Sequence, residues 1–438
     1  MASTCPVPVS SLLSPTTSPR LHYLLSGTFN TLFLYLLSFS PHSSPPTLDV
    51  ERAYRAQGPH QFLAVNEERD RAYATTWAQP PTLSSWTIID GGRRGIEKLN
   101  TVPISATGSY LTLLPSSLSA SLSLSPSTGA RIYQAGGPVA QTLEVDPATG
   151  GFGTQLQEVV YLDGGVDELW DDAKTDRTRV ALRYGSHAVD IDPVRGRAYV
   201  PHVGRDSIFV YSFNRDGTLH ELAEVASHGR KGHEGPRHSI PSRDGNKLYV
   251  VTEHTSYLDV YDVHSSSPFL AHSQRLSVIP RSLDSDRLQY RGDTLRISLD
   301  GERLYVTTRG KTTREKGYVS VWKVNGDGSI EDLGTAGRSN AGNAAFEKGY
   351  GAMSRFETAT SGGKANAIEV FPFGSGEERS RGHDWIVLTD DEQGWVSILE
   401  WTDDAGELSE VAKVQLGRQA GADDDERETG ASHAVWLS

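Results

Sequence analysis

One pattern of apolar and polar positions is repeated within residues 180–263. Each copy has a short apolar segment, a polar turn and two further segments in which apolar and polar side chains alternate, and the two turns read DPVRGR and SRDGNK. Turns of Gly, Asp, Asn and Pro between short alternating segments predict antiparallel hairpins. A repeat of about 50 residues is typical of an array of such sheets.

The same pattern recurs on both sides of this central pair. It can be recognised in four further ranges: 60–77, 130–153, 291–333 and 364–414. The closing segment ASHAVWLS resembles GSHAVDID at the start of the central repeat. A lone final strand that copies the first position of a repeat indicates a closed ring, because closure leaves no large sheet edge exposed. The sequence therefore predicts an all-β fold: a seven-bladed β-propeller whose ring is closed by pairing of the N- and C-terminal strands.

The domain boundaries follow from where this pattern fails. Residues 1–20 are rich in Ser, Thr and Pro, and we expect them to be a disordered leader. Residues 21–438 are expected to form one propeller domain, because the repeat runs through them. Loop insertions are expected near 90–129, with at most one strand, and near 335–357.

The most apolar segment, residues 21–39, resembles a membrane helix at first sight. Polar residues and Gly27 interrupt it, so neither half reaches the ~20 apolar residues that a span requires. We expect two buried strands joined by a turn at Gly27, and no contact with a membrane.

Composition limits the class of partner. The formal net charge of −13 argues against nucleic-acid binding, because neutralising phosphates requires a basic surface. A small anionic substrate remains compatible, since a pocket can be locally basic on an acidic protein. The single cysteine, Cys5, excludes an intramolecular disulfide, which suits a reducing compartment and predicts a cytoplasmic protein. A homo-oligomer is compatible with the sequence.

When the copies are stacked, two sets of equivalent positions carry polar side chains that vary from copy to copy. The first set lies four residues after the central residue of the second strand: Trp77, Val203, Glu253, Arg309 and Asp390. The second set opens the first strand: His187, Arg237 and His433, with Gln61, Asp293 and Asn366 as looser equivalents. The ends of the inner strands of a propeller face a funnel that binds ligands. These residues, with Arg291 close by, are the candidate site.

Other polar clusters carry less weight. Asp390 and Asp391 fit a tight turn capped by its own carboxylates better than a general-acid pair. His228, His233 and His238 are unevenly spaced and lack a carboxylate or thiolate at a ligand spacing, so we expect no zinc or other metal. No G-x-S-x-G nucleophile motif is present.

Five segments carry a resemblance to a known family: GSHAVDIDP, GPRHSI, KLYVVTEH, YRGDTLRISLDGERLYVTTR and DWIVLTDDEQGWVSILEW. In these the chain resembles the fungal 3-carboxy-cis,cis-muconate cyclases, or 3-carboxymuconate lactonizing enzymes, within the wider seven-bladed lactonase propellers. The resemblance implies closure of an unsaturated tricarboxylate to a lactone without a metal or organic cofactor. It implies active-site roles for four residues that the repeat comparison also selects: His187, Arg237, Glu253 and Arg309.

The implied reaction adds a carboxylate to a conjugated double bond. Arg237 and Arg309 would bind substrate carboxylates and stabilise the enolate-like charge. His187 is the natural general acid, while Glu253 either donates the proton itself or holds a neighbour in place. We expect Arg291, His433 and Asn366 to contribute to substrate binding.

Some positions depart from the family pattern. Gly235 and His238 stand where the family has His and Trp, Lys364 and Ala365 where it has His and Ser, and His433 where it has Asn. These changes leave the substrate open. A propeller lactonase that hydrolyses a sugar lactone, like the 6-phosphogluconolactonases, is one alternative, with Glu253 or Asp390 activating water. A non-catalytic propeller that binds a partner on its rim is another.

Overall fold

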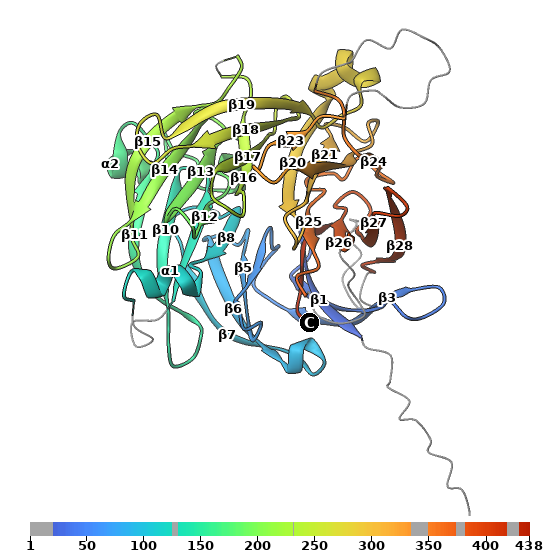
Figure 1. Cartoon of the computed structure of the whole chain (residues 1–438). Helices are drawn as coiled ribbons and strands as arrows, with labels where there is room; N and C mark the ends of the chain where they lie inside the picture. Colours follow the sequence, from blue (N-terminus) through green and yellow to red (C-terminus); the bar gives the residue numbers. More distant parts are fainter. Residues whose placement is uncertain (1–20, 125–129, 231, 334–348, 374–381, 418–428) are drawn as a thin grey trace, which may run out of the picture.

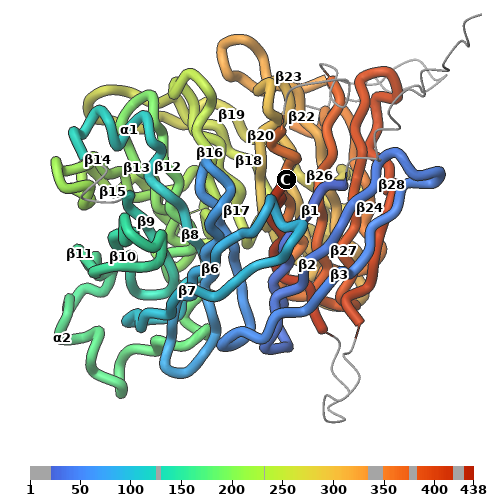
Figure 2. The backbone as a smooth tube through the Cα atoms, turned by 90° about the horizontal axis from the view of Figure 1, so that it is seen from below, coloured from blue at the N-terminus to red at the C-terminus, as the bar shows by residue number. Residues whose placement is uncertain are grey.

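The computed structural model describes residues 21–438 except 125–129, 231, 334–348, 374–381 and 418–428 (Figure 1). Seven antiparallel sheets follow one another around a common axis, as Figure 2 shows from a second direction. The prediction of a seven-bladed β-propeller is confirmed. The predicted leader, residues 1–20, lies outside the described residues.

The first blade joins the two ends of the chain. It consists of β1 (His22–Thr28), β2 (Phe33–Ser40), β3 (Thr47–Arg55) and the last strand, β29 (Ala431–Trp436). β29 pairs antiparallel with β1, with Leu24 opposite Trp436 and Ser26 opposite Ala434. Every residue of β29 is buried, so the predicted ring closure is confirmed.

The other six blades follow in chain order. The second is β4 (Leu63–Val65), β5 (Arg71–Thr75), β6 (Thr82–Ile89) and β7 (Gly95–Pro103). The third is β8 (Tyr110–Leu113), β9 (Arg131–Gly136), β10 (Val139–Val145) and β11 (Phe152–Val160). The fourth is β12 (Asp190–Asp192), β13 (Arg197–His202), β14 (Ser207–Phe213) and β15 (Leu219–Ala226).

The fifth blade is β16 (Pro236–Pro241), β17 (Lys247–Thr252), β18 (Tyr257–Val263) and β19 (Leu270–Ser277). The sixth is β20 (Tyr290–Ile297), β21 (Arg303–Gly310), β22 (Tyr318–Val324), β23 (Ile330–Glu331) and β24 (Ser354–Glu357). The seventh is β25 (Ile368–Val370), β26 (His383–Thr389), β27 (Trp395–Thr402) and β28 (Glu407–Gln415).

Short helices lie in the connections between strands. They are α1 (Ser116–Ser121), α2 (Gly165–Leu169), η1 (Asp90–Gly92), η3 (Arg179–Arg183) and η4 (Arg281–Gln289). No helix in the described part of the chain is long and apolar enough to cross a bilayer.

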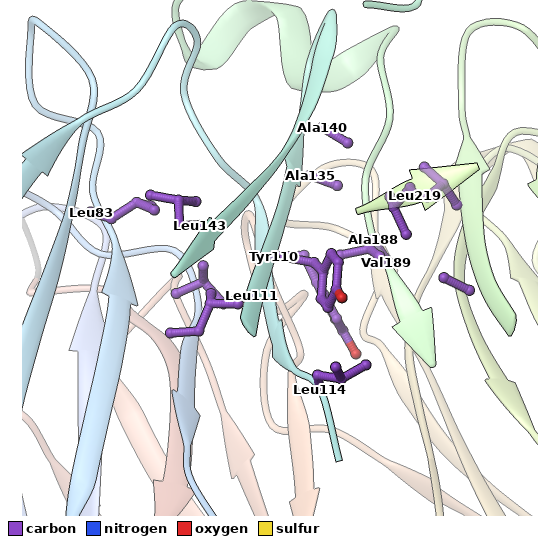
Figure 3. Packing of buried hydrophobic residues seen from close by; sticks show 14 of the residues in the cluster. Leu83, Tyr110, Leu111, Leu114, Ala135, Ala140, Leu143, Ala188, Val189 and Leu219 are labelled. Carbon is purple, nitrogen blue, oxygen red and sulfur yellow. The ribbon is translucent and has the colours of Figure 1, made fainter. Parts of the chain in front are cut away.

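Burial explains which strands the sequence marked clearly. The middle strand β13 is buried along its whole length, whereas the outer strand β15 exposes several of its residues. A strand covered on both faces is apolar throughout, because neighbouring blades pack on each side of it. Figure 3 shows this packing where Leu83 of β6, Leu143 of β10 and Leu111 of β8 meet in the cluster that joins the second, third and fourth blades.

The tyrosine that recurs in the second strand ties each blade to the next one. The hydroxyls of Tyr73, Tyr133 and Tyr249 donate hydrogen bonds to the carbonyl oxygens of Gly150, Gly217 and Gly328 at 2.8, 2.6 and 2.7 Å. Each of these glycines lies in a turn of the following blade. These three tyrosines therefore make the same contact between neighbouring blades. The Tyr305 hydroxyl instead donates to Asp384 of the seventh blade at 2.8 Å, and the Tyr199 hydroxyl has no hydrogen-bond partner among the described residues.

We expect Tyr249→Phe to lower the free energy of unfolding by about 1 kcal/mol, because it leaves the buried Gly328 carbonyl without its donor. Urea unfolding measures the change. The matched control is Tyr184→Phe, whose side chain is 60% exposed, and this variant is expected to unfold like the wild type. Equal stabilities of the two variants would contradict the role given to the repeated tyrosine.

Two expectations about loops were wrong. Residues 90–129 hold β7, α1 and β8, so most of this segment completes the second blade and begins the third. β7 was missed because seven of its nine residues are only half-buried or exposed, so apolar and polar positions do not alternate clearly. β8 was missed because its four residues are too few to show a pattern. Gly27 lies inside β1, and the turn to β2 follows it. Of the expected insertion 335–357, residues 335–348 lie outside the described residues, and β24 pairs with β22.

Candidate functional site

The candidate residues gather at the end of the central channel where the inner strands begin. Arg237 lies in β16, and His187 precedes β12. Glu253 follows β17, where its N–H donates to the Gly235 carbonyl at 2.7 Å. Arg309 lies in β21, opposite Arg291 of β20. Three adjacent blades therefore present the four residues that the sequence selected.

Glu253 bridges the two arginines. Its Oε2 lies 3.3 Å from Arg237 Nε, and its Oε1 accepts a hydrogen bond from Arg309 Nη2 at 3.1 Å. Burial alone would raise the pKa of Glu253, but Arg309 and Arg237 outweigh it and hold the pKa at about 2. Glu253 is therefore ionised at neutral pH and fixes the two guanidinium groups.

A second carboxylate, Asp293 of β20, holds the same two arginines from the other side. Its Oδ1 lies 2.8 Å from Arg237 Nη1 and 3.9 Å from Arg309 Nε, and its Oδ2 accepts the Asn366 N–H at 2.6 Å. The side chain is completely buried. The sequence placed Asp293 only among looser equivalents of His187 and Arg237, and the contacts make it part of the site.

The charges of the site balance. Arg237 and Arg309 carry two positive charges, and Glu253 and Asp293 carry two negative ones. Breaking such a buried arrangement by removing one partner leaves an uncompensated charge, so the four groups hold one another in place. The Nε atoms of both arginines are buried and face these carboxylates, Arg237 Nε at 3.3 Å from Glu253 and Arg309 Nε at 3.9 Å from Asp293.

His187 faces these charges as a neutral imidazole. Burial and the nearby Arg237 lower its pKa well below 6.5, and Glu253 opposes this only partly. Its Nδ1 is buried and has no hydrogen-bond partner among the described residues. A general acid with an ordinary pKa is therefore not what the protein alone provides, because burial and Arg237 disfavour the charged imidazolium of His187.

His238 lies beside His187, and the two ring centroids are 5.2 Å apart. Its Nε2 lies 3.2 Å from Arg237 Nη1. Because the guanidinium only donates, His238 Nε2 accepts and the hydrogen sits on Nδ1. In the sequence, His238 was considered as a metal ligand together with His228. The His228 ring stacks on His272 instead, so His228 and His238 do not form one site. Within the described residues no group of three or more His, Cys, Asp or Glu side chains is arranged to hold a metal ion.

The predicted binding residues divide into two groups. Arg291 lies next to Arg309, and its guanidinium donates to the backbone carbonyls of Leu288 and Tyr290, at 3.4 and 3.2 Å. Asn366 is buried and donates from Nδ2 to the Thr308 carbonyl at 2.9 Å, which puts it in the wall of the site.

His433 does not join the four candidate residues. Its ring stacks on Phe62 at 4.0 Å, its Nδ1 accepts the Leu63 N–H at 3.3 Å, and its Nε2 lies 3.7 Å from Glu369. Its side chain is 1% exposed. These contacts place His433 in the channel wall. Direct binding of substrate by His433 stays a prediction.

Asp390 and Asp391 belong to a turn, as the sequence indicated. Asp390 accepts hydrogen bonds from the Glu392 N–H at 2.9 Å and the Thr360 hydroxyl at 2.7 Å. Asp391 pairs with Lys364 Nζ at 2.7 Å. The lysine that departs from the family pattern is thereby neutralised by the neighbouring turn.

Gly235, another departure from that pattern, adopts φ +65°, and a Cβ there would lie 2.9 Å from the His254 ring. The His254 ring therefore occupies the space beside Gly235 that a side chain would need.

At the opposite end of the channel a cavity of about 990 Å³ opens, with Phe62, Tyr110, Arg296 and Glu369 among its lining.

Comparison with known proteins agrees with this geometry. Residues 174–339 match the family described as Lactonase, 7-bladed beta-propeller. The periplasmic gluconolactonase of Pseudomonas aeruginosa has the same fold, with a TM-score of 0.68 at 15% identity over 96% of this chain and 99% of that one. The chain is thus a seven-bladed propeller with lactonase-type relatives.

The resemblance to fungal muconate cyclases is also confirmed. Muconate cycloisomerase 1 of Cutaneotrichosporon cutaneum is 29% identical over 407 residues, which are 92% of this chain and 96% of that protein. Carboxy-cis,cis-muconate cyclase of Neurospora crassa is 23% identical over 238 residues, which are 53% of this chain and 57% of that protein.

Proposed function

We propose that this chain is a cycloisomerase that closes 3-carboxy-cis,cis-muconate, or a similar unsaturated polycarboxylate, to a lactone. The observation that carries the proposal is the pair Arg237 and Arg309, held by two carboxylates beside a buried, neutral His187. The names of the two muconate relatives support the substrate class.

Binding uses the arginines of the site. Arg291, Arg309 and Arg237 take substrate carboxylates through their guanidinium groups, which match carboxylates in shape and charge, and Arg309 is the more exposed of the two clamped arginines. The charges of Arg237 and Arg309 balance those of Glu253 and Asp293. Arg291 therefore supplies the net positive charge that favours an anion at this end of the channel.

Ring closure forms one C–O bond. A carboxylate oxygen adds to the conjugated double bond, and the electron pair of that bond moves onto the distal carboxyl as an enolate. Arg237 and Arg309 stabilise this charge where it develops, which is the largest contribution that fixed donors make to catalysis. A proton then adds to the carbon next to the enolate, so a trianion and one proton give a dianionic lactone.

The proton comes from His187. Burial and Arg237 lower its pKa in the free protein. A bound polyanion reverses the balance, because a nearby negative charge favours the imidazolium. Substrate binding therefore charges His187 at the moment when an acid is needed. Glu253, with a pKa of about 2, is ionised and orients the arginines instead.

The direct test is loss of the ultraviolet absorbance of the diene when purified protein meets 3-carboxy-cis,cis-muconate or other muconates. No absorbance change with any of them would overturn the proposal.

A sugar lactonase is the second candidate, because the family match is to lactonases. Acid release from gluconolactones, together with inertness toward muconates, would select it.

The pH profile tests the role of His187. Because its pKa in the free protein lies well below 6.5, kcat/KM is expected to rise steadily as the pH falls from 9 to 6. The kcat profile, which reports the complex, should level off at a higher pH than kcat/KM does. Stopped assays in constant-ionic-strength buffers measure both. A kcat/KM that falls toward pH 6 would contradict His187 as the acid.

A further inference from the structure

The substrate class proposed above carries more negative charge than the site described so far can neutralise. A tricarboxylate has three negative charges at neutral pH. Arg237 and Arg309 are balanced by the two carboxylates that hold them, which leaves Arg291 as the single net cation of the site. We therefore expect further positive charge at the same end of the channel.

The opposite wall of this end carries aromatic side chains. Trp77 follows β5 as Glu253 follows β17, so both lie at the end of the channel that holds the candidate site. Trp77 Nε1 donates to Gln61 Oε1 at 2.8 Å, and the Trp77 ring lies 4.7 Å from the ring of Phe29. In a ring of seven blades the second is farthest from the fifth and sixth, which carry the arginines. Trp77 therefore lies across the channel from them.

The wall between Arg309 and Trp77 is continuous. The Gly363 carbonyl accepts a hydrogen bond from Arg309 Nη1 at 3.4 Å. Further along the same loop, Ala365 packs in a buried apolar cluster with Phe29, and Trp77 packs against this cluster. A ligand held at Arg309 thus has this apolar wall beside it, with Trp77 at the far end.

Arg179 is the cation of this far end. It is the first residue of η3, and its guanidinium carbon lies 5.0 Å from the centre of the Trp77 ring. The residue is exposed, and it makes no hydrogen bond or ion pair with the described residues. Lys364, by contrast, is paired with Asp391 at 2.7 Å. Arg179 therefore keeps an uncompensated positive charge.

The segment that carries Arg179 crosses the third blade toward His187. The Arg177 carbonyl accepts the Thr107 N–H at 3.0 Å, shortly before β8 begins, and η3 ends four residues before His187. A guanidinium over an indole ring is attracted by the π electrons, with about 0.5–1 kcal/mol at exposed sites. Trp77 therefore favours a position of Arg179 at the edge of the channel.

We propose that Arg179, held on Trp77, is a carboxylate-binding subsite for the third carboxylate of a tricarboxylate substrate. This inference rests on the proposed function. The carboxyl groups that take part in ring closure stay with the arginines of the fifth and sixth blades, and Arg179 pairs with the remaining one from the opposite wall. Arg179 thereby selects a tricarboxylate over an unsubstituted muconate.

The test compares Arg179→Ala with the wild-type chain on 3-carboxy-cis,cis-muconate and on cis,cis-muconate, which lacks the third carboxylate. For the tricarboxylate, KM should rise about 10-fold or more with kcat little changed, because one charge-assisted contact of the bound substrate is lost. With cis,cis-muconate, used as substrate or as competitive inhibitor, the affinity should stay at the wild-type value. Arg179→Lys keeps the charge and should recover part of the loss.

Arg177→Ala is the matched control, because it removes the same charge and the same kind of ring contact. Arg177 lies 4.4 Å over the Trp170 ring and pairs with Asp172 at 2.6 Å, so its charge is already neutralised. Its KM for both muconates should equal that of the wild type. A wild-type KM in Arg179→Ala overturns the subsite. An equal rise for the two muconates overturns it as well, because unspecific attraction predicts that result.

Failure of the proposed function is distinguishable from failure of the subsite. If the wild-type chain turns over no muconate, the proposed function falls, and binding is then measured by titration calorimetry with tricarballylate and with glutarate as probes. A higher Kd for tricarballylate in Arg179→Ala, with an unchanged Kd for glutarate, supports the subsite. Equal Kd values for tricarballylate in the two proteins overturn it, and so does a wild-type chain that binds no tricarballylate.

Discussion

Arg309→Ala is expected to lower kcat/KM about 10³-fold, which is the effect of removing one donor that stabilises a developing oxyanion. Arg309 is the more exposed of the two clamped arginines, at 18% against 6% for Arg237, so it meets the substrate most directly. The loss has a second cause, because Glu253 would keep only Arg237 and would no longer hold it in the same position. The diene absorbance assay measures it.

Two further variants make this result specific. Arg309→Lys keeps the charge but loses the planar pair of donors, so it should recover only part of the activity. Arg215→Ala removes an exposed arginine of the β14–β15 turn and should leave kcat/KM at the wild-type value. A fully active Arg309→Ala would show that the substrate binds elsewhere.

The second large effect is on stability in mild acid. Five buried histidines have a pKa lowered mainly by burial: His60, His187, His202, His238 and His433. Below pH 6.5 the unfolded chain binds a proton at each of them and the folded chain does not, so stability falls as the pH falls.

Asp190, whose folded pKa is about 6, acts in the opposite direction, because the folded chain then binds its proton first. Because the buried histidines outnumber this one carboxyl, the free energy of unfolding is expected to decrease between pH 7.5 and 5.5. Because a typical domain is stable by only about 5 to 15 kcal/mol, we expect a steep fall in melting temperature over this interval. Calorimetry at several pH values measures it.

Single variants assign this loss to the buried imidazoles. His60 is completely buried, and neither of its ring nitrogens has a hydrogen-bond partner among the described residues, so His60→Leu should reduce the pH dependence by about one proton. The exposed His220 serves as the control, and His220→Gln should leave the pH dependence unchanged. A stability that is flat from pH 7.5 to 5.5 would contradict this account.

The sequence predicted the part of the fold that repetition encodes. The tyrosine and the Gly-containing turn recur, and three copies make the same contact with their neighbour, as Tyr133 does with Gly217. β7 and β8 were not predicted. The outer strand β7 is exposed on one side, and the four residues of β8 are too few to show an alternating pattern.

The sequence also selected residues for the candidate site. Stacking the repeats selected His187, Arg237, Glu253 and Arg309, because equivalent positions in a propeller lie on one ring. The same comparison also selected His433, whose ring stacks on Phe62 in the channel wall, and its part in substrate binding stays a prediction. Only the contacts distinguish a residue that lines the funnel from one that fills the wall.

By itself the sequence determined the architecture and the ring of positions where chemistry is possible, because strand period, turn residues and repeat length are local properties of the chain. Tertiary structure alone decided how those positions interact. Asp293 and Glu253, 40 positions apart, close on the same two arginines, and burial leaves His187 uncharged. Charge pairing and desolvation depend on distances between blades, and no local pattern carries them.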